Sequence, residues 1–261
     1  MANPKEKNQK ISVSSLKQFK QNHKKITALT AYDFPTAKIL DEAGLDIILV
    51  GDSLGNVILG YENTLPVTMA DMLHHLKAVR RAVKKSLLVV DLPLLGTRDQ
   101  RPGTRVKNIL KLIDAGAEAV KIEGLEHLDL IKECIKAGIP VMGHIGFTPQ
   151  DIEKLGGAKM QGKTKEAAEK LIKDAKQLEA AGVFAIVIEL VPEDVATQIT
   201  AAVEIPTIGI GAGRHTDGQV LVLHDILGLT QGKTPKFVKQ YANLGDLTKQ
   251  AVQSYIRDVT A

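Results

Sequence analysis

The stretch Ala180-Ala-Gly-Val-Phe-Ala-Ile-Val-Ile-Glu189 joins the end of a predicted helix to an apolar run that stops at a carboxylate. Its glycine is the residue type that most often follows a helix at its C-terminus, because it adopts the left-handed conformation at no steric cost. The run from Phe184 to Ile188 contains no polar residue. It therefore predicts a strand buried on both faces, as the strands of a parallel sheet are.

The same unit recurs along the chain, which indicates an alternation of helices and parallel strands. Four further apolar runs end at a polar residue: Asp46-Ile-Ile-Leu-Val-Gly-Asp52, Leu87-Leu-Val-Val-Asp91, Ala119-Val-Lys-Ile-Glu123 and Ile139-Pro-Val-Met-Gly-His144. Strands are expected at residues 26–31, 46–51, 87–90, 119–122, 140–143, 184–188, 206–210 and 219–223. Eight strands within 261 residues predict an α/β fold, the (β/α)8 TIM barrel, which typically has about 250 residues.

The domain organisation follows from this count. We expect a single barrel domain over residues 1–261, with a lysine-rich leader at about 1–25 and an extra helical segment at about 235–261. The leader is predicted to be a solvated tail followed by a short helix at 14–24. The C-terminal segment has apolar positions that the barrel need not bury, which favours contact with a partner. These positions are Phe237, Tyr241, Leu244, Leu247, Val252 and Ile256.

Charge and composition exclude several classes of function. The net charge of +4 arises from the leader, which has seven lysines and one acid, so the rest of the chain is close to neutral. A near-neutral body without tryptophan argues against nucleic-acid binding. Cys134 is the only cysteine, so neither an internal disulfide nor a cysteine metal site is expected. No apolar stretch approaches the ~18 residues of a membrane helix, and no apolar signal core follows the lysines, so we expect a cytoplasmic protein.

Carboxylates end four of the predicted strands, at Asp52, Asp91, Glu123 and Glu189. The carboxyl ends of barrel strands form one rim, where active sites of this fold lie. Any one of these acids could simply cap a helix or form a turn. Four at corresponding positions favour a site instead, and converging carboxylates without a His or Cys cluster suit a hard cation such as Mg²⁺.

Other side chains at this rim extend the prediction. Lys121 shares strand parity with Glu123, so it places a cation beside the carboxylates, either for an anionic substrate or as a structural ion pair. His144 could orient a substrate, relay a proton or make only a structural hydrogen bond. Glu189 follows a dry apolar run, a setting that raises the pKa of a carboxyl group and suits a general base.

Several segments, taken in order, resemble the ketopantoate hydroxymethyltransferase (3-methyl-2-oxobutanoate hydroxymethyltransferase) family. The resemblance runs from about Ile11 to Ile256. The segments are Val50-Gly-Asp-Ser-Leu-Gly55, Thr64-Leu-Pro-Val-Thr68, Asp91-Leu-Pro93, Val120-Lys-Ile-Glu-Gly124, Gly143-His-Ile-Gly-Phe-Thr-Pro-Gln150, Pro206-Thr-Ile-Gly-Ile-Gly-Ala-Gly213, Thr216-Asp-Gly-Gln219 and His224-Asp-Ile-Leu-Gly228. Residues 94–102 and Leu125 depart from the family pattern.

The resemblance implies a barrel of the phosphoenolpyruvate mutase and isocitrate lyase type, assembled as a homodecamer. It implies transfer of a hydroxymethyl group from 5,10-methylenetetrahydrofolate to 3-methyl-2-oxobutanoate, giving 2-dehydropantoate (ketopantoate) by Mg²⁺-assisted enolate formation. That reaction is the first committed step of pantothenate and coenzyme A synthesis.

The resemblance also implies a role for individual residues. The metal ligands would be Asp52 and Asp91, with Glu123 binding directly or through water. The keto acid would contact Asp52, Ser53, Asp91 and Lys121. Glu189 would be the base, with His144 as an auxiliary residue. Two rival hypotheses are a Mg²⁺-dependent lyase or mutase on the same barrel, and a non-catalytic barrel that serves as a binding subunit.

Overall fold

The computed structural model describes residues 9–98, 103–230, 232 and 234–261. Four residues of the atypical 94–102 loop, and the first eight residues of the leader, lie outside this part of the chain. The described chain divides into two compact units, Met1–Val220 and Leu221–Ala261, and each is described by itself. Within the described residues, no helix is both long enough and apolar enough to cross a membrane.

Eight parallel strands close into a barrel in sequence order, which confirms the predicted fold. The strands are β1 (Ile26–Thr30), β2 (Ile47–Val50), β3 (Leu87–Asp91), β4 (Ala119–Glu123), β5 (Val141–Gly146), β6 (Ala185–Glu189), β7 (Thr207–Ile210) and β8 (Gly218–Leu221). The first and last strands meet where Ile26 N–H donates to the carbonyl oxygen of Asp217, at 3.0 Å. Asp91, Glu123 and Glu189 are the last residues of their strands rather than the first residues after them.

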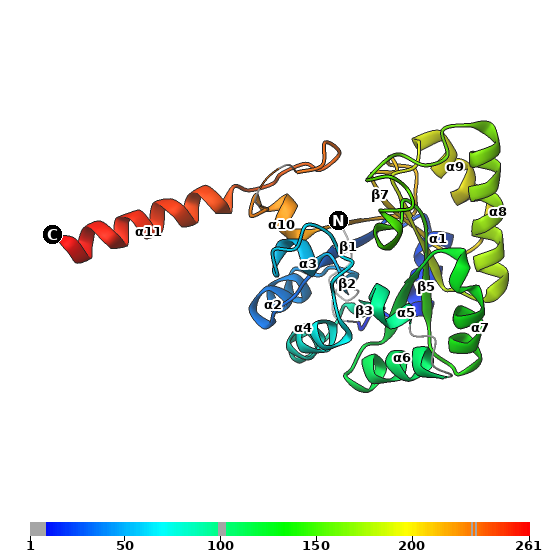
Figure 1. Ribbon diagram of the computed structural model, residues 1–261, viewed down its shortest axis with the longest axis horizontal. Coiled ribbons are helices and arrows are strands. Elements are labelled where there is room, and N and C mark those ends of the chain that lie inside the picture. The colour runs from blue at the N-terminus through cyan, green and yellow to red at the C-terminus, as the bar shows by residue number, and fades with distance from the viewer. Residues whose placement is uncertain (1–8, 99–102, 231, 233) are drawn as a thin grey trace. The chain divides into compact units, whose positions relative to one another are not determined.

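Helices surround the strands on the outside of the barrel (Figure 1). They are α2 (Phe34–Ala43), α4 (Met69–Ala82), α6 (Thr104–Asp114), α7 (Leu128–Lys136), α8 (Lys165–Ala181) and α9 (Glu193–Ala202). Gly44 and Gly182 cap α2 and α8 in the left-handed conformation, with φ of 86° and 97°. Short elements lie in the connections that follow four of the strands. They are the helices α3 (Leu54–Val57) and α5 (Leu94–Thr97) and the 3-10 turns η2 (Leu125–His127) and η3 (Pro149–Asp151).

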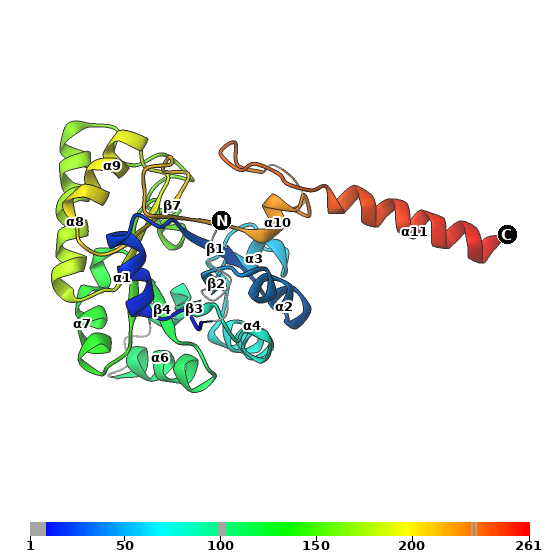
Figure 2. The same ribbon diagram turned by 180° about the vertical axis from the view of Figure 1, so that it is seen from behind.

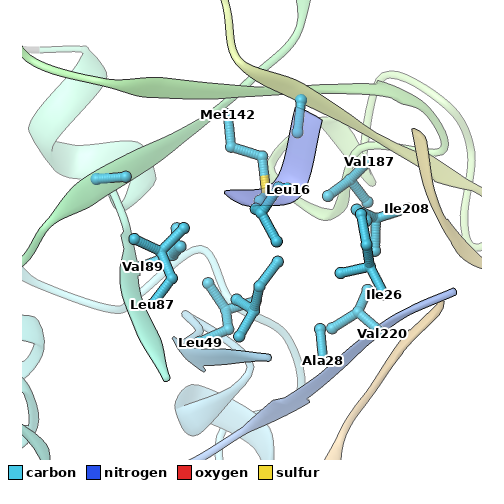
Figure 3. Close-up of a cluster of buried hydrophobic side chains, with 13 residues drawn as sticks. Leu16, Ile26, Ala28, Leu49, Leu87, Val89, Met142, Val187, Ile208 and Val220 are labelled. Carbon is cyan, nitrogen blue, oxygen red and sulfur yellow. The ribbon is translucent and has the colours of Figure 1, made fainter. Parts of the chain in front are cut away.

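Apolar side chains from alternate strand positions fill the barrel interior. They come from all eight strands, and a leucine from outside the barrel, Leu16, is buried among them. Figure 3 shows the side chain of Leu16 among those of Leu49, Val89 and Met142. The interior is therefore a packed core and not a channel, as expected for this fold.

Leu16 belongs to α1 (Val13–Gln21), which lies in front of the strands in Figure 2. Lys20 Nζ donates to the carbonyl oxygens of Thr200 and Ile205, both at 3.0 Å, just before β7 begins. The helix predicted at 14–24 is thus present, at Val13–Gln21. This part of the leader packs against the barrel and is not a solvated tail. It covers the N-terminal ends of the strands and fills the core there.

The second unit contains α10 (Leu223–Ile226) and α11 (Leu244–Thr260). The prediction of a helical segment from about residue 235 was wrong in its start, because the long helix begins nine residues later. Asn243 caps it, with its side-chain oxygen accepting from Asp246 N–H at 3.3 Å. The apolar residues Phe237 and Tyr241 precede the helix and do not belong to it. No residue of α11 is buried.

Candidate active site

At the carboxyl ends of the strands the barrel interior changes from apolar to charged. Strand pairing aligns Asp91 with Lys121, Glu123 with His144, and Gly146 with Glu189. These positions continue the inward-facing parity of Val89, Ala119, Met142, Ala185 and Val187, which form the apolar core below. The charged residues of this layer thus follow the last core residue of their own strand by two positions, or by four at Glu123, on neighbouring strands.

Lys121 lies at the centre of this charged layer. Its Nζ is 3.1 Å from Asp91 Oδ1, 3.1 Å from Glu123 Oε1 and 3.4 Å from His144 Nδ1. Only 5% of the residue is exposed. Burial alone would lower the pKa of Lys121, but the charges of Asp91 and Glu123 outweigh it and raise that pKa. The ammonium group is therefore held charged inside the barrel.

Glu123 is fully engaged by donors. Oε1 accepts from Lys121 at 3.1 Å and lies 3.1 Å from His144 Nδ1, and Oε2 accepts from the backbone N–H of Gln150 at 3.1 Å. Burial opposes ionisation, but the charges of Lys121 and His144 outweigh it and lower the pKa of Glu123 to about 2. Glu123 is thus a fixed anion that links β4 to β5.

His144 connects this cluster to Glu189. Its Nδ1 faces Glu123, and its Nε2 lies 3.3 Å from Glu189 Oε2. Burial would lower the pKa of His144, but the charge of Glu123 outweighs it and raises that pKa to about 9. An imidazole between two carboxylates is therefore doubly protonated at neutral pH. Glu189 is the more open end, with 16% of its side chain exposed.

Within the part of the chain that the structure describes, Asp52 is the carboxylate of this cluster that forms no ion pair with a Lys, Arg or His side chain. Its backbone N–H donates to Asp91 Oδ2 at 3.0 Å, and its Oδ2 accepts from Gln150 Nε2 at 2.9 Å. Burial raises the pKa of Asp52, and the charges of Asp91 and Glu123 raise it further. The cluster therefore has more carboxylate than its own cations neutralise.

This excess fits a divalent cation, because a metal would supply the positive charge that Asp52 lacks. Among the residues that the structure describes, no three His, Cys, Asp or Glu side chains are arranged to hold a metal by themselves. That is compatible with Mg²⁺, which takes one or two carboxylates and completes its shell with water and substrate oxygens. The donor set consists of oxygen atoms of the kind that Mg²⁺ prefers.

Ser53 follows Asp52 and is held by a residue of another loop. Its Oγ shares a hydrogen bond of 2.8 Å with the hydroxyl of Tyr32, which is almost completely buried. Nδ1 of His75 in α4 donates to the carbonyl oxygen of Tyr32 at 2.7 Å. The ring of His75 therefore anchors the backbone that positions Tyr32.

All seven residues singled out in the sequence gather at the ends of β2 to β6. Sequence reasoning missed Gln150, Tyr32 and His75. Gln150 stood in a quoted family segment, but a neutral amide in a turn gave no signal of its own. Tyr32 lies two residues after β1, and its position just beyond a strand end was the only available signal.

A closed parallel barrel with a buried charged cluster at the carboxyl ends of its strands is the architecture of a (β/α)8-barrel enzyme. The sequence model of the ketopantoate hydroxymethyltransferase family matches residues 10–261, and this chain belongs to that family. Its homologues are transferases by name.

Two relatives illustrate the similarity. The 3-methyl-2-oxobutanoate hydroxymethyltransferase of Thermoanaerobacter sp. (strain X514) is 52% identical over 252 residues, covering 96% of this chain and 92% of the relative. The protein of the same name from Pyrobaculum aerophilum (strain ATCC 51768 / DSM 7523 / JCM 9630 / CIP 104966 / NBRC 100827 / IM2) is 56% identical over 232 residues, covering 88% of each.

Solved structures share the fold of this chain. One is 2,3-dimethylmalate lyase, a member of the phosphoenolpyruvate mutase/isocitrate lyase superfamily, with a TM-score of 0.62 and 13% identity over 96% of this chain and 88% of the other. Another is phosphonopyruvate hydrolase in complex with oxalate and Mg²⁺, with a TM-score of 0.62 and 14% identity over 96% and 87%. At this identity the likeness establishes the fold alone.

Proposed function

We propose that this protein transfers a hydroxymethyl group from 5,10-methylenetetrahydrofolate to 3-methyl-2-oxobutanoate and so forms 2-dehydropantoate. The reaction would be the first committed step of pantothenate and coenzyme A synthesis. The family and the names of the relatives support the keto acid as acceptor. The observation that supports the chemistry most directly is the buried ammonium of Lys121 among carboxylates, with the more open Glu189 beside them.

The residues that would hold Mg²⁺ are Asp52 and Asp91. Both oxygens of Glu123 already accept from or face nitrogen donors, which favours a water between Glu123 and the cation. A bound Mg²⁺ would supply positive charge next to the keto oxygen, where negative charge builds up when C3 loses its proton. The excess of buried carboxylate around Asp52 supports this assignment.

The protein's own side chains would bind and deprotonate the keto acid. Lys121 presents a buried positive charge to an anionic substrate, and its fixed orientation requires no reorganisation during the reaction. Ser53, held by Tyr32, offers a hydroxyl beside Asp52. Glu189 would take the proton from C3, and the enolate carbon would form the new carbon–carbon bond to the one-carbon unit of the folate. The carbon–nitrogen bonds of that unit would break, water would supply the hydroxyl oxygen of the product, and tetrahydrofolate would leave. The protonated His144 beside Glu189 would balance the charge of the carboxylate before the proton is taken.

We also propose that the protein is a closed homo-oligomer, most simply the homodecamer that the family resemblance implies. Four exposed apolar residues of α11 recur at helical spacing and share one face: Val252, Tyr255, Ile256 and Val259. A contiguous apolar face of this kind is typical of an interface between subunits.

The experiment that tests the proposed reaction separates its two halves. The protein is incubated with Mg²⁺ and 3-methyl-2-oxobutanoate in deuterated water, and the C3 proton is followed by NMR. We expect the C3 signal to disappear without folate, because Glu189 removes the proton and a deuteron returns. Adding 5,10-methylenetetrahydrofolate should then yield 2-dehydropantoate. Absence of both exchange and product would overturn the proposed function.

A further inference from the structure

Gln150 lies where three strand ends meet, in the 3-10 turn η3 that follows β5. Only 4% of the residue is exposed. Its Nε2 donates to Asp52 Oδ2 at 2.9 Å and to the carbonyl oxygen of Leu92 at 3.0 Å. Its backbone N–H donates to Glu123 Oε2 at 3.1 Å. One residue therefore connects the ends of β2, β3 and β4.

The chemistry of these partners determines how the amide group is oriented. Both neighbours of the side chain are acceptors, one a carboxylate oxygen and the other a carbonyl oxygen, so the NH₂ group must face them. Reversing the amide would bring its oxygen against two oxygens in a buried site. Both hydrogens of Nε2 are thus used, and the side chain is fixed from both sides.

A neutral donor suits this position for a physical reason. Asp52 is buried and forms no ion pair with a Lys, Arg or His of the described residues, so its carboxylate needs a hydrogen-bond donor to keep one orientation. A lysine here would neutralise the carboxylate and compete with a metal ion. An amide holds one oxygen of Asp52 without adding charge, and thereby sets the direction of the other oxygen.

We propose that Gln150 is a positioning residue that orients Asp52 and Glu123 for a divalent cation. The inference rests on the proposed function, since the cation concerned is the Mg²⁺ of that reaction. Gln150 makes no contact with substrate in this proposal and acts only through the two carboxylates. Partners that orient metal ligands typically account for 10–100-fold in metal affinity.

The test uses Mn²⁺ as the probe, because its free concentration is measured directly by electron paramagnetic resonance. Gln150→Met keeps the length of the side chain and the backbone N–H but removes both side-chain donors. Gln150→Asn keeps a carboxamide but draws it back by one methylene, so it cannot reach both acceptors. Gln198→Leu is the matched control, because Gln198 Nε2 donates only to the carbonyl oxygen of Asp194 on the exposed surface of α9.

Mn²⁺ is titrated into each folded protein with and without 3-methyl-2-oxobutanoate, and the thermal midpoint is measured in parallel. We expect about 10–100-fold weaker Mn²⁺ binding in both Gln150 variants and no change in the control. Binding within threefold of the unmodified protein in either folded Gln150 variant would overturn the inference. Failure of the unmodified protein to bind Mn²⁺ under both conditions would also overturn it.

The C3 exchange assay distinguishes this inference from the proposed function. If the unmodified protein exchanges C3 and both variants bind Mn²⁺ normally, the function stands and the role of Gln150 falls. If the variants lose Mn²⁺ affinity while the unmodified protein neither exchanges C3 nor forms 2-dehydropantoate, the positioning role stands and the function falls.

Discussion

Nε2 of His144 lies 3.3 Å from Oε2 of Glu189, while Nδ1 of the same ring faces Glu123. One imidazole thus joins a fully engaged carboxylate to a partly exposed one. The two carboxylates therefore differ in their surroundings. Glu123 is fixed as an anion by three donors, whereas the side chain of Glu189 is partly exposed. This division favours Glu189 as the group that exchanges a proton with a substrate.

Replacing the base should separate binding from catalysis. Glu189→Gln is expected to keep Mn²⁺ and keto-acid binding within a few-fold, because the residue is not a ligand in our proposal. It should lower C3 exchange and turnover by ~10²–10⁴, the usual contribution of general base catalysis. Calorimetry and NMR exchange measure the two effects, with the exposed Glu169→Gln as control. Loss of binding together with activity would make Glu189 a ligand or structural residue, and retained exchange would show that another group is the base.

Replacing Asp52, the carboxylate of the cluster that forms no ion pair among the described residues, should stabilise the metal-free protein and weaken metal binding. Burial and two neighbouring carboxylates raise the pKa of Asp52, so its ionised form opposes folding at neutral pH. Asp52→Asn is expected to raise the thermal midpoint in EDTA at pH 8, to lose this advantage near pH 4, and to weaken Mn²⁺ binding at least ~10-fold.

Asp41→Asn is the control for that measurement, because the opposite change in stability is expected for it. Its carboxylate accepts from the backbone N–H groups of Lys84, Lys85 and Ser86, at 2.8–3.0 Å. Burial opposes ionisation, but these hydrogen bonds outweigh it and lower the pKa of Asp41. Asp41→Asn should therefore destabilise the protein, by about 1–3 kcal/mol. Equal shifts in both variants would contradict our assignment of Asp52.

The His144 imidazolium predicts a stability that falls in alkaline solution. Its folded-state pKa of about 9 lies above the unfolded value near 6.5. The stabilisation is complete below about pH 6.5 and is lost as pH rises through about 9, a change of about 3 kcal/mol. Urea unfolding in EDTA between pH 6 and 9.5 should show this decline, and His144→Gln should remove it. The exposed His215→Gln should leave it intact, so parallel profiles for all three proteins would contradict the prediction.

The apolar face of α11 predicts the assembly state. We expect sedimentation at micromolar concentration to show a closed oligomer, and the double substitution Tyr255→Ser with Val259→Ser to reduce its size or weaken it. The exposed polar substitution Gln250→Ala on the same helix should have no effect. A monomeric unmodified protein would refute the proposal, as would an unchanged oligomer in the double variant.

The periodicity of the sequence was sufficient to predict the barrel and the rim, because both depend on which residues alternate and where apolar runs stop. Asp91, Glu123 and Glu189 could be placed because strand ends converge in any closed barrel. Gln150 and Tyr32 could not, since their roles depend on which turn reaches which strand end. The same limit explains the C-terminal error: Phe237 and Tyr241 have the spacing of a helix, but only the cap at Asn243 decides where α11 begins.

The burial of Leu16 in the barrel core has a consequence for the order in which substrates bind. Because α1 covers the N-terminal ends of the strands, every molecule that reaches Lys121 has to pass through the opposite rim. Two reactants that share one entrance cannot arrive independently when one lies deeper than the other. If the keto acid contacts the buried Lys121, as we propose, it would enter before the folate and leave, as product, after it. Product inhibition by 2-dehydropantoate should accordingly be competitive with the keto acid and not with the folate.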